Sequence, residues 1–276
     1  MAPSVRHASG ADDPAFDAFR MRERQLNTRL HRRGERDDAR FVAEGDLVVM
    51  RALEVGHVPE ILICDPSALD LVESRIDSLG IPLDTTEIVV ADESTRRSAT
   101  GLGVALSIVG LFRKPPFVEL HDLLHRNDKV IVLSQVDNPT NVGAVVRSAA
   151  AFGFAGLVLD AESADPYARR ALRVAMGTTF QLDVARVPDD DLFDRLHSQG
   201  FESYAMTPAT DATDLARVRL GDRIALVLGS ERDGLPTAHL ERATHRVRIP
   251  MSAGVDSLNV AAAAAVACYG LTIRNG

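Results

Sequence analysis

The chain has 276 residues, of which 46% are hydrophobic and 25% charged, which is enough for one large domain or two modest ones. No apolar stretch reaches the ~20 residues of a membrane-spanning helix, and the first residues lack the apolar segment of a secretion signal. The two cysteines, Cys64 and Cys268, lie far apart, which excludes a disulfide framework and a cysteine-based zinc site. We therefore expect a cytoplasmic protein.

The formal net charge of −8 argues against a nucleic-acid partner, because phosphate binding needs a basic surface. The basic residues are segregated, however. All but two of them are arginines, eight lie between Arg20 and Arg40, and Arg169, Arg170 and Arg173 form a second cluster. One interpretation is a solvated helix face. The other is contact with RNA, since arginine suits bidentate binding of phosphate.

Residues 1–115 are expected to form an α/β domain that begins with an arginine-rich helix within residues 1–40. Apolar periodicity and glycine stops then predict helices at 46–55 and 69–79 and strands at 60–64, 88–91 and 104–112. Pro115 and Pro116 indicate a linker, placed at 116–127, because proline interrupts regular structure.

Residues 128–276 alternate strands and helices throughout. The expected strands are 129–135, 156–160, 182–187, 201–207, 223–228 and 245–249, and the expected helices are 141–152, 167–176, 190–199, 237–243 and 258–273. This alternation predicts a parallel sheet with helices on both faces.

Three loops that follow these strands carry unusual chemistry, and ligands gather at such loops in parallel sheets. The loop at 136–143 leads into a helix that bears Arg147. The loop at 229–236 holds two glycines and Glu231. The loop at 249–259 has Ser257 at the N-cap position of the last helix and Asn259 in its first turn.

Each polar residue in these loops also has a plainer interpretation. Asn141 and Ser257 could cap helices, and Glu231 could be a solvated acid. Arg147 stands in an otherwise apolar helix, so we expect its side chain to be buried or half-buried with a partner, and Glu231 is the plainest one.

Other ligand-binding motifs of α/β proteins are not matched. Gly101-Leu-Gly103 begins a dinucleotide-binding fingerprint, but Leu106 occupies the position of the third glycine. The sequence has no Walker A motif, no nucleophile elbow and no metal-ligand spacing, so we expect no metal site and disfavour a nucleotide-dependent oxidoreductase.

The three loops resemble, in order, the three motifs of the SpoU (TrmH-like) RNA 2′-O-methyltransferases of the SPOUT superfamily. The matching segments are Asn138-Pro-Thr-Asn-Val-Gly-Ala-Val-Val-Arg-Ser-Ala149, Leu228-Gly-Ser-Glu-Arg-Asp-Gly-Leu235, and Ile249-Pro-Met with Ser257-Leu-Asn-Val260. A weaker resemblance, from Phe41-Val-Ala-Glu-Gly-Asp-Leu47 onward, is to the small ribosomal-protein-like RNA-binding domain that many members carry.

The resemblance implies a methyltransferase domain at 128–276 with a deep trefoil knot, a homodimer, and S-adenosylmethionine as the cofactor. It places five residues at catalytic positions, namely Arg147, Asn141, Glu231, Ser257 and Asn259. It assigns the cofactor pocket to Leu228, Gly229, Gly234, Ile249, Met251, Ser257 and Leu258. The sequence departs from the family at Ala261 and Ala175, where serine is common.

The implied activity is methylation of a ribose 2′-hydroxyl in structured RNA, with ribosomal RNA favoured over tRNA because of the N-terminal domain at 1–115. A tRNA methyltransferase and a catalytically silent RNA-binding protein of the same fold are the alternatives. Arg147 is expected to bind the phosphate beside the target ribose, because guanidinium stays protonated near neutral pH. Asn141 and Ser257 are expected to hold polar groups, and Glu231 to orient Arg147 or Asn141. The expected RNA contacts elsewhere are Arg29, Arg32, Arg33, Arg169, Arg170 and Arg173.

Overall fold

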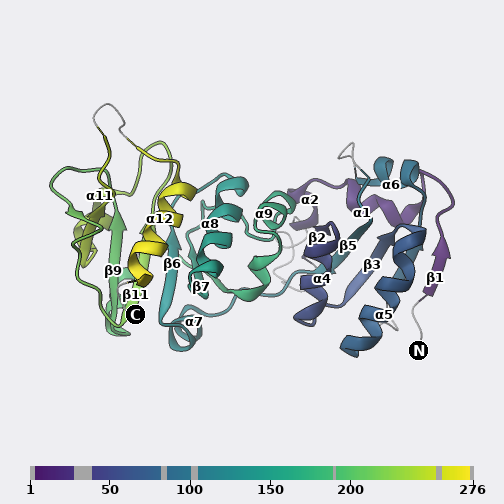
Figure 1. The fold of residues 1–276 in the computed structure, drawn as a ribbon, viewed down its shortest axis with the longest axis horizontal. Coiled ribbons are helices and arrows are strands. Elements are labelled where there is room, and N and C mark those ends of the chain that lie inside the picture. The colour runs from purple at the N-terminus through teal and green to yellow at the C-terminus, as the bar shows by residue number, and fades with distance from the viewer. Residues whose placement is uncertain are drawn as a thin grey trace. The chain divides into compact units, whose positions relative to one another are not determined.

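The computed structural model describes residues 4–27, 39–81, 86–100, 105–188, 191–252 and 257–273. The chain divides into two compact units (Figure 1). Unit 1 comprises residues 1–116 and 167–180, and unit 2 comprises residues 117–166 and 181–276. None of the helices in the described ranges is long and apolar enough to cross a membrane.

Unit 1 is built on a five-stranded mixed sheet with the strand order β1-β4-β3-β5-β2. Strand β5 runs antiparallel to both of its neighbours, whereas β1, β4 and β3 are parallel. The strands are β1 (Ser4–His7), β2 (Arg40–Glu44), β3 (Pro59–Cys64), β4 (Glu87–Val90) and β5 (Ile108–Arg113). The helices are α1 (Asp17–Arg20), α2 (Glu23–Asn27), α4 (Asp46–Glu54), α5 (Leu69–Leu79), α6 (Glu93–Thr100) and α9 (Arg169–Val174), with short 3₁₀ turns η1 (Pro14–Phe16), η3 (Pro66–Ala68) and η4 (Thr178–Gln181).

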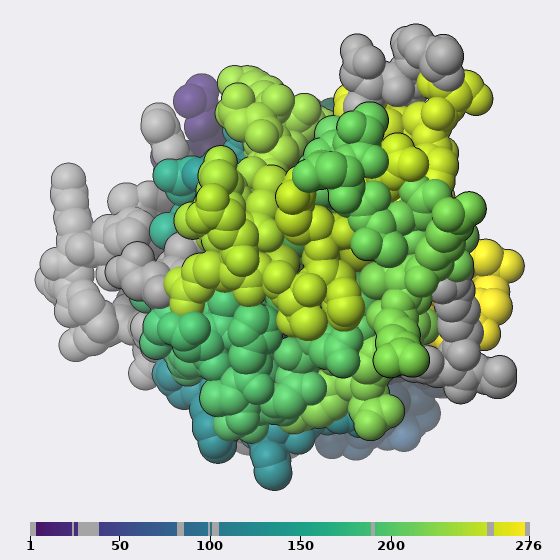
Figure 2. Space-filling view, turned by 90° about the vertical axis from the view of Figure 1, so that its left-hand side faces the viewer, coloured from purple at the N-terminus to yellow at the C-terminus, as the bar shows by residue number. Residues whose placement is uncertain are grey.

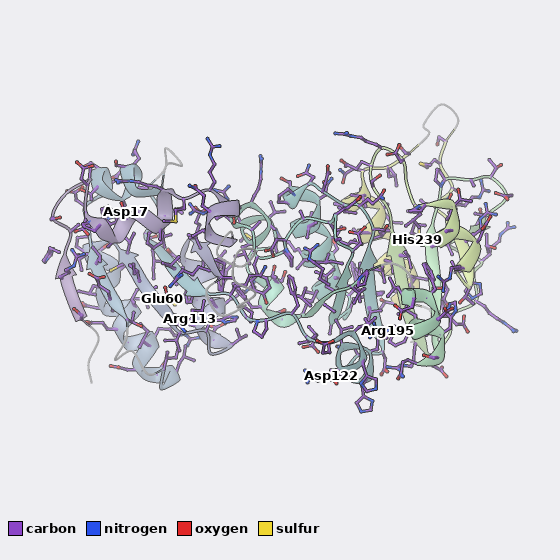
Figure 3. All side chains as sticks on the ribbon, turned by 180° about the vertical axis from the view of Figure 1, so that it is seen from behind. Asp17, Glu60, Arg113, Asp122, Arg195 and His239 are labelled. Carbon is purple, nitrogen blue, oxygen red and sulfur yellow. The ribbon has the colours of Figure 1, made fainter. Side chains whose placement is uncertain are left out.

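Glu60 on β3 ties the centre of this sheet to its edge. Its carboxylate accepts hydrogen bonds from Arg40 Nε of β2 at 2.6 Å and from Arg113 Nε of β5 at 2.9 Å. Glu60 and Arg113 lie together in Figure 3. The core beneath the sheet includes Phe16, Phe19 and the inward side chains of β2, β3 and β5.

Helix α9 joins unit 1 although it lies in the second half of the sequence. The guanidinium of Arg169 donates to the backbone oxygens of Ala18, Phe19 and Met21, and the Arg169 backbone N–H donates to Glu23 at 2.9 Å. These bonds satisfy the carbonyl groups at the end of α1. They fix α9 against the N-terminal part of the chain.

Unit 2 contains a seven-stranded sheet in which every strand pair is parallel, so the predicted parallel sheet is confirmed. The strand order is β10-β12-β9-β11-β6-β7-β8. The strands are β6 (Lys129–Leu133), β7 (Gly156–Leu159), β8 (Asp183–Arg186), β9 (Phe201–Met206), β10 (Thr213–Asp214), β11 (Arg223–Leu228) and β12 (His245–Arg248). The helices are α7 (Leu120–Arg126), α8 (Pro139–Ala151), α10 (Leu192–Ser198), α11 (Thr237–Arg242) and α12 (Val260–Thr272).

The strand order brings together loops that are far apart in the sequence. Strand β11 lies between β6 and β9, and β12 lies on the other side of β9. Figure 2 shows a side face of unit 2, on which green segments near residue 200 and yellow-green segments near residue 240 lie side by side. Because all these strands are parallel, the loops after β6, β9, β11 and β12 emerge at one edge of the sheet.

Several sequence predictions about elements need correction. Residues 116–127 are not only a linker, since α7 lies within them and its Leu120, Leu123 and Leu124 belong to the core of unit 2. Strands β1 and β2 and helix α6 were not predicted. The strand predicted at 104–112 begins only at Ile108. The arginine-rich helix predicted within 1–40 is represented by η1, α1 and α2, and residues 28–38 lie outside the described ranges.

Candidate active site

A cavity of about 380 Å³ opens at the carboxyl edge of the unit 2 sheet. Every residue that the sequence predicted for the cofactor lines it, namely Leu228, Gly229, Gly234, Ile249, Met251, Ser257 and Leu258. Glu231 lines it as well. The loops after β11 and β12 therefore form one concave surface, as their motif order predicted.

The sequence analysis did not predict that residues at the end of β9 line the cavity. Met206, Thr207 and Pro208 line the cavity, as does Leu240 of α11. Strand β9 is the neighbour of both β11 and β12. Its carboxyl end must then lie beside the two motif loops. The sheet order, which a single sequence does not reveal, was the missing information.

The turn at 229–235 is closed on itself. The backbone N–H of Ser230 donates to the Gly234 oxygen at 3.1 Å, and the Gly234 N–H donates to the Ser230 oxygen at 3.1 Å. Gly234 has a φ of +70°, a conformation that favours glycine. A Cβ atom on Gly229 would lie 2.3 Å from the backbone carbon and oxygen of Gly234. Both glycines are thus required by the shape of this turn.

Asn259 connects the first and second motif loops. Its Nδ2 donates to Asn141 Oδ1 at 3.2 Å and also to Glu231 Oε1. Asn141 is 6% exposed, and it lies in the first turn of α8. The three side chains that the resemblance assigned to catalysis on three separate motifs therefore form one hydrogen-bonded cluster.

The helix caps differ from the sequence expectation. Asn138 caps α8 by accepting from the Thr140 N–H at 2.9 Å, so Asn141 is free of a capping role. Asn259, not Ser257, caps α12, because its Oδ1 accepts from the Ala261 N–H at 2.9 Å and from the Ala262 N–H at 3.4 Å. Ser257 is exposed and lines the cavity. One side chain, Asn259, thus both starts the last helix and orders the cluster.

Arg147 does not have the environment that the sequence predicted. Its side chain is exposed, and within the described ranges it makes no hydrogen bond or ion pair. The expected partner, Glu231, is bonded to Asn259 instead. Arg147 is not among the residues that line the cavity. The expectation of a buried guanidinium was wrong because this face of α8 points to solvent, and an exposed charge needs no protein partner.

The arginines expected to bind RNA have different surroundings. Arg169 is 15% exposed and is engaged with the backbone of α1, and Arg173 lies 3.2 Å from Glu44. Burial raises the pKa of the Glu44 carboxyl, and Arg173 and Arg169 act against that shift. Arg170 is exposed. Arg29, Arg32 and Arg33 lie outside the described residues. Of the second cluster, only Arg170 keeps a guanidinium that faces solvent and makes no bond to the described chain.

Comparison with known proteins identifies the family. Residues 128–269 match the SpoU rRNA methylase family. An uncharacterised tRNA/rRNA methyltransferase of Mycobacterium tuberculosis is 34% identical over 279 aligned positions, which cover 99% of this chain and 93% of that protein. The chain belongs to the SpoU rRNA methylase family. The resemblance of the three motifs is thereby confirmed.

Two further proteins resemble the chain over most of its length. The 23S rRNA (guanosine(2553)-2′-O)-methyltransferase RlmP of Bacillus subtilis is 29% identical over 246 residues, which cover 88% of this chain and 93% of that protein. A crystal structure of AdoMet-bound rRNA methyltransferase from Sinorhizobium meliloti superimposes with a TM-score of 0.81, at 24% identity, over 98% of each chain. The likeness in fold to this crystal structure therefore extends through both units. The trefoil knot stays a prediction.

Proposed function

We propose that this chain is a cytoplasmic, S-adenosylmethionine-dependent enzyme that methylates a ribose 2′-hydroxyl in structured RNA, with ribosomal RNA as the substrate class. The observation that carries the proposal is the Asn141–Asn259–Glu231 cluster beside a cavity lined by the motif loops. Membership of the SpoU family supports it, as does the 23S rRNA 2′-O-methyltransferase named for the Bacillus subtilis relative.

The cavity suits S-adenosylmethionine in size and chemistry. Its volume of about 380 Å³ lies within the range of small-molecule sites. Leu228, Met251 and Leu258 offer apolar walls for an adenine ring. Glu231, Asp233 and Arg232 offer charges that complement a sulfonium and an amino-acid group. Glu231 and Asp233 therefore suit the cationic parts of such a ligand, and Arg232 suits its carboxylate.

Asn141, Asn259 and Arg147 have different roles in positioning the substrate and the cofactor. The bound cofactor supplies an electrophilic methyl group on a sulfonium. Asn141 and Asn259 hold polar groups of the substrate or cofactor at fixed positions, because Asn259 is itself held by Glu231 and by the start of α12. Arg147 presents an exposed guanidinium, which is bonded to no residue in the described ranges, for the phosphate next to the target ribose. That contact orients the hydroxyl and stabilises negative charge as it develops.

Methyl transfer from labelled cofactor tests this function directly. The purified protein should transfer the methyl group of S-adenosylmethionine to rRNA, and digestion should recover it as a 2′-O-methyl nucleoside. Mapping of ribose methylation in total RNA with and without the gene should show one site lost. Loss of a site in tRNA alone would select the tRNA alternative. Absence of both transfer and cofactor binding would select the silent RNA-binding protein.

Variants of Asn259 separate its two roles. Asn259→Ala should lower the free energy of unfolding by about 1 kcal/mol through loss of the cap. Asn259→Ser should restore the cap but not the bonds to Asn141 and Glu231, because the serine side chain is shorter. We expect both variants to slow methyl transfer about 10²-fold, since the cluster loses its centre. Thermal unfolding and single-turnover rates measure the two effects. Near-normal turnover in Asn259→Ser would limit Asn259 to helix capping.

RNA affinity is expected to depend on the arginine clusters and to be separable from cofactor affinity. Each lost phosphate contact lowers the log–log salt slope by about 0.7–0.9. Replacing Arg29, Arg32 and Arg33 with alanine should therefore flatten the slope by about 2 units. Arg170→Ala should flatten it by the amount expected for one lost contact, about 0.7–0.9. The matched control is Arg97→Ala, which removes an exposed arginine that is paired with Glu93. If the slope equals that of the control, the arginine clusters are solvated surface that does not contact RNA.

The homodimer is expected to form through α12. Three exposed residues of this helix and its C-cap residue are spaced by three or four positions on one side: Ala262, Val266 (42%), Tyr269 (55%) and Ile273 (53%). A contiguous exposed apolar stripe of this kind is typical of an interface. The small residues beside it permit close helix packing.

Light scattering at micromolar concentration tests the dimer. The wild type should be dimeric, and the double variant Val266→Arg, Ile273→Arg should be monomeric with unchanged unfolding temperature, because both side chains face solvent. Leu71→Arg, which alters an even more exposed apolar residue of unit 1, should stay dimeric. A monomeric wild type, or an interface made only by residues before Pro115, would contradict the expectation.

A further inference from the structure

The loop that precedes α8 contains a backbone conformation that its residue disfavours. Gln135 has a φ of +58°, in the left-handed region where side chains are strained. It lies two residues after the end of β6, in the segment 134–138, which leads to the cap of α8 and to Asn141. A non-glycine residue keeps this conformation only where its surroundings impose it.

The surroundings of Gln135 include a buried carboxylate from the next strand along the sheet. Asp160, which follows β7, is 6% exposed. Its Oδ2 accepts from the Gln135 backbone N–H at 2.7 Å, and its Oδ1 accepts from the Ser163 N–H at 2.7 Å and the Glu162 N–H at 3.2 Å. Both oxygens are therefore occupied by backbone donors. An asparagine or alanine at position 160 could not accept all three of these hydrogen bonds.

Ser163 holds the next residue of the same loop. Its Oγ accepts from the Val136 N–H at 3.1 Å and donates to the Leu133 oxygen at 3.2 Å, and the side chain is 4% exposed. The Ala164 N–H donates to the Val136 oxygen at 2.9 Å. The segment after β7 thus bonds to the last residue of β6, Leu133, and to Gln135 and Val136 in the segment that follows β6.

Arg186, at the end of β8, binds the segment that follows β7. Its guanidinium donates to the backbone oxygens of Asp160 and, at 2.9 Å, of Ser163. Burial lowers the pKa of Arg186, and the charges of Asp165 and Asp160 act against that shift. Hydrogen bonds thus connect β8 to the segment after β7, and that segment to the loop before α8, the helix that carries Asn141.

We propose that Asp160 and Ser163 are positioning residues for the active site, which hold the 134–138 loop in the strained shape that places Asn141 against Asn259. The inference rests on the proposed methyltransferase function for its catalytic consequence. Neither side chain lines the cavity, so neither touches the reacting groups. Their effect reaches the site through the backbone of Gln135 and Val136.

A rescue experiment tests this role. Asp160→Ala should lower kcat about tenfold to 100-fold with little change in KM for the cofactor, because a displaced Asn141 misaligns groups that still bind. Gln135→Gly in the same chain should recover most of the lost kcat, since glycine adopts the left-handed conformation without strain. Gln135→Gly alone should turn over like the wild type. An Asp160→Ala variant that Gln135→Gly does not rescue would overturn the proposal for Asp160.

A matched pair of serine variants controls for general loss of stability. Ser163→Ala and Ser203→Ala each remove a fully buried hydroxyl that accepts a backbone N–H, from Val136 at 3.1 Å and from Thr244 at 2.9 Å respectively. Ser203 lies in β9 and contacts His197 and Thr244 away from the cavity. Both variants should lower the unfolding temperature, but only Ser163→Ala should lower kcat. Equal turnover in the two variants would overturn the proposal for Ser163.

Hydrogen exchange decides the structural claim without any activity. In Asp160→Ala, the amides of residues 134–142 should exchange at least about tenfold faster than in the wild type, because a buried donor loses its acceptor and the loop opens locally. Unchanged exchange there would overturn the inference even if turnover fell. If the wild type transferred no methyl group, the proposed function would fail, and the exchange result would still decide whether Asp160 holds the loop.

Discussion

Replacing Arg147 with alanine should slow methyl transfer by about 10²–10³-fold, which is the usual effect of removing one group that stabilises charge in a transition state. The fold and the cofactor affinity should be nearly unchanged, because the side chain is exposed and does not line the cavity. Unfolding temperature, cofactor binding by calorimetry and single-turnover rate on one preparation measure the three quantities.

Arg147→Lys is the informative companion variant. Lysine keeps the positive charge but lacks the planar fork that binds two phosphate oxygens at once, so we expect it to restore little of the rate. A variant with alanine that turns over normally would remove Arg147 from the mechanism. A variant with alanine that melts early but keeps its rate per folded molecule would show that the residue supports the fold instead.

Gly229→Ala should weaken cofactor binding about 10- to 100-fold. Overpacking costs about 1–3 kcal/mol, and we expect the 229–235 turn to change shape to relieve it, at the expense of cofactor affinity. The added Cβ would lie 2.3 Å from the Gly234 carbonyl and 2.4 Å from the Leu235 nitrogen, and backbone atoms can yield only if the 229–235 turn opens. Calorimetric titration with S-adenosylmethionine measures the affinity.

Gly221→Ala is the control for this substitution. Its Cβ would also collide, at 2.6–2.9 Å, but with the side chain of Glu202, which can rotate away. Gly221 precedes β11, at the end of the strand opposite to the cavity. We expect its cofactor affinity to equal that of the wild type. If both variants bound equally well, the turn at Gly229 would be more adaptable than its contacts indicate.

The parallel architecture of unit 2 and the loops of its site were predictable because each motif follows an apolar run and precedes a helix start. The predicted boundaries of α8 and α12 differ from the observed ones by one or two residues. Asn259 was recognised as a site residue, but its capping role was given to Ser257, since serine and asparagine are equally good caps and stand two residues apart. Distinguishing them requires the path of the backbone.

Other features depend on contacts between distant parts of the chain. Strand β1 is short and mostly exposed, and α6 has no apolar face, so neither leaves a clear periodic pattern. Arg169 and Arg173 look like a basic patch in the sequence, but acids and carbonyl groups more than 120 residues away engage them. The strain at Gln135 and the carboxylate that holds it are likewise invisible to pattern analysis, because each is ordinary on its own.

The position of α9 in unit 1 means that the chain passes from one unit to the other three times, near residues 116, 166 and 180. A single proteolytic cut at Pro116 would therefore not separate two complete bodies. The N-terminal fragment would lose the helix that bonds to the carbonyls at the end of α1, and the C-terminal fragment would retain that helix without its partners. Exchange of the N-terminal part between relatives must accordingly include residues 167–180, so recombination at one junction is a poor route to new RNA specificity in this architecture.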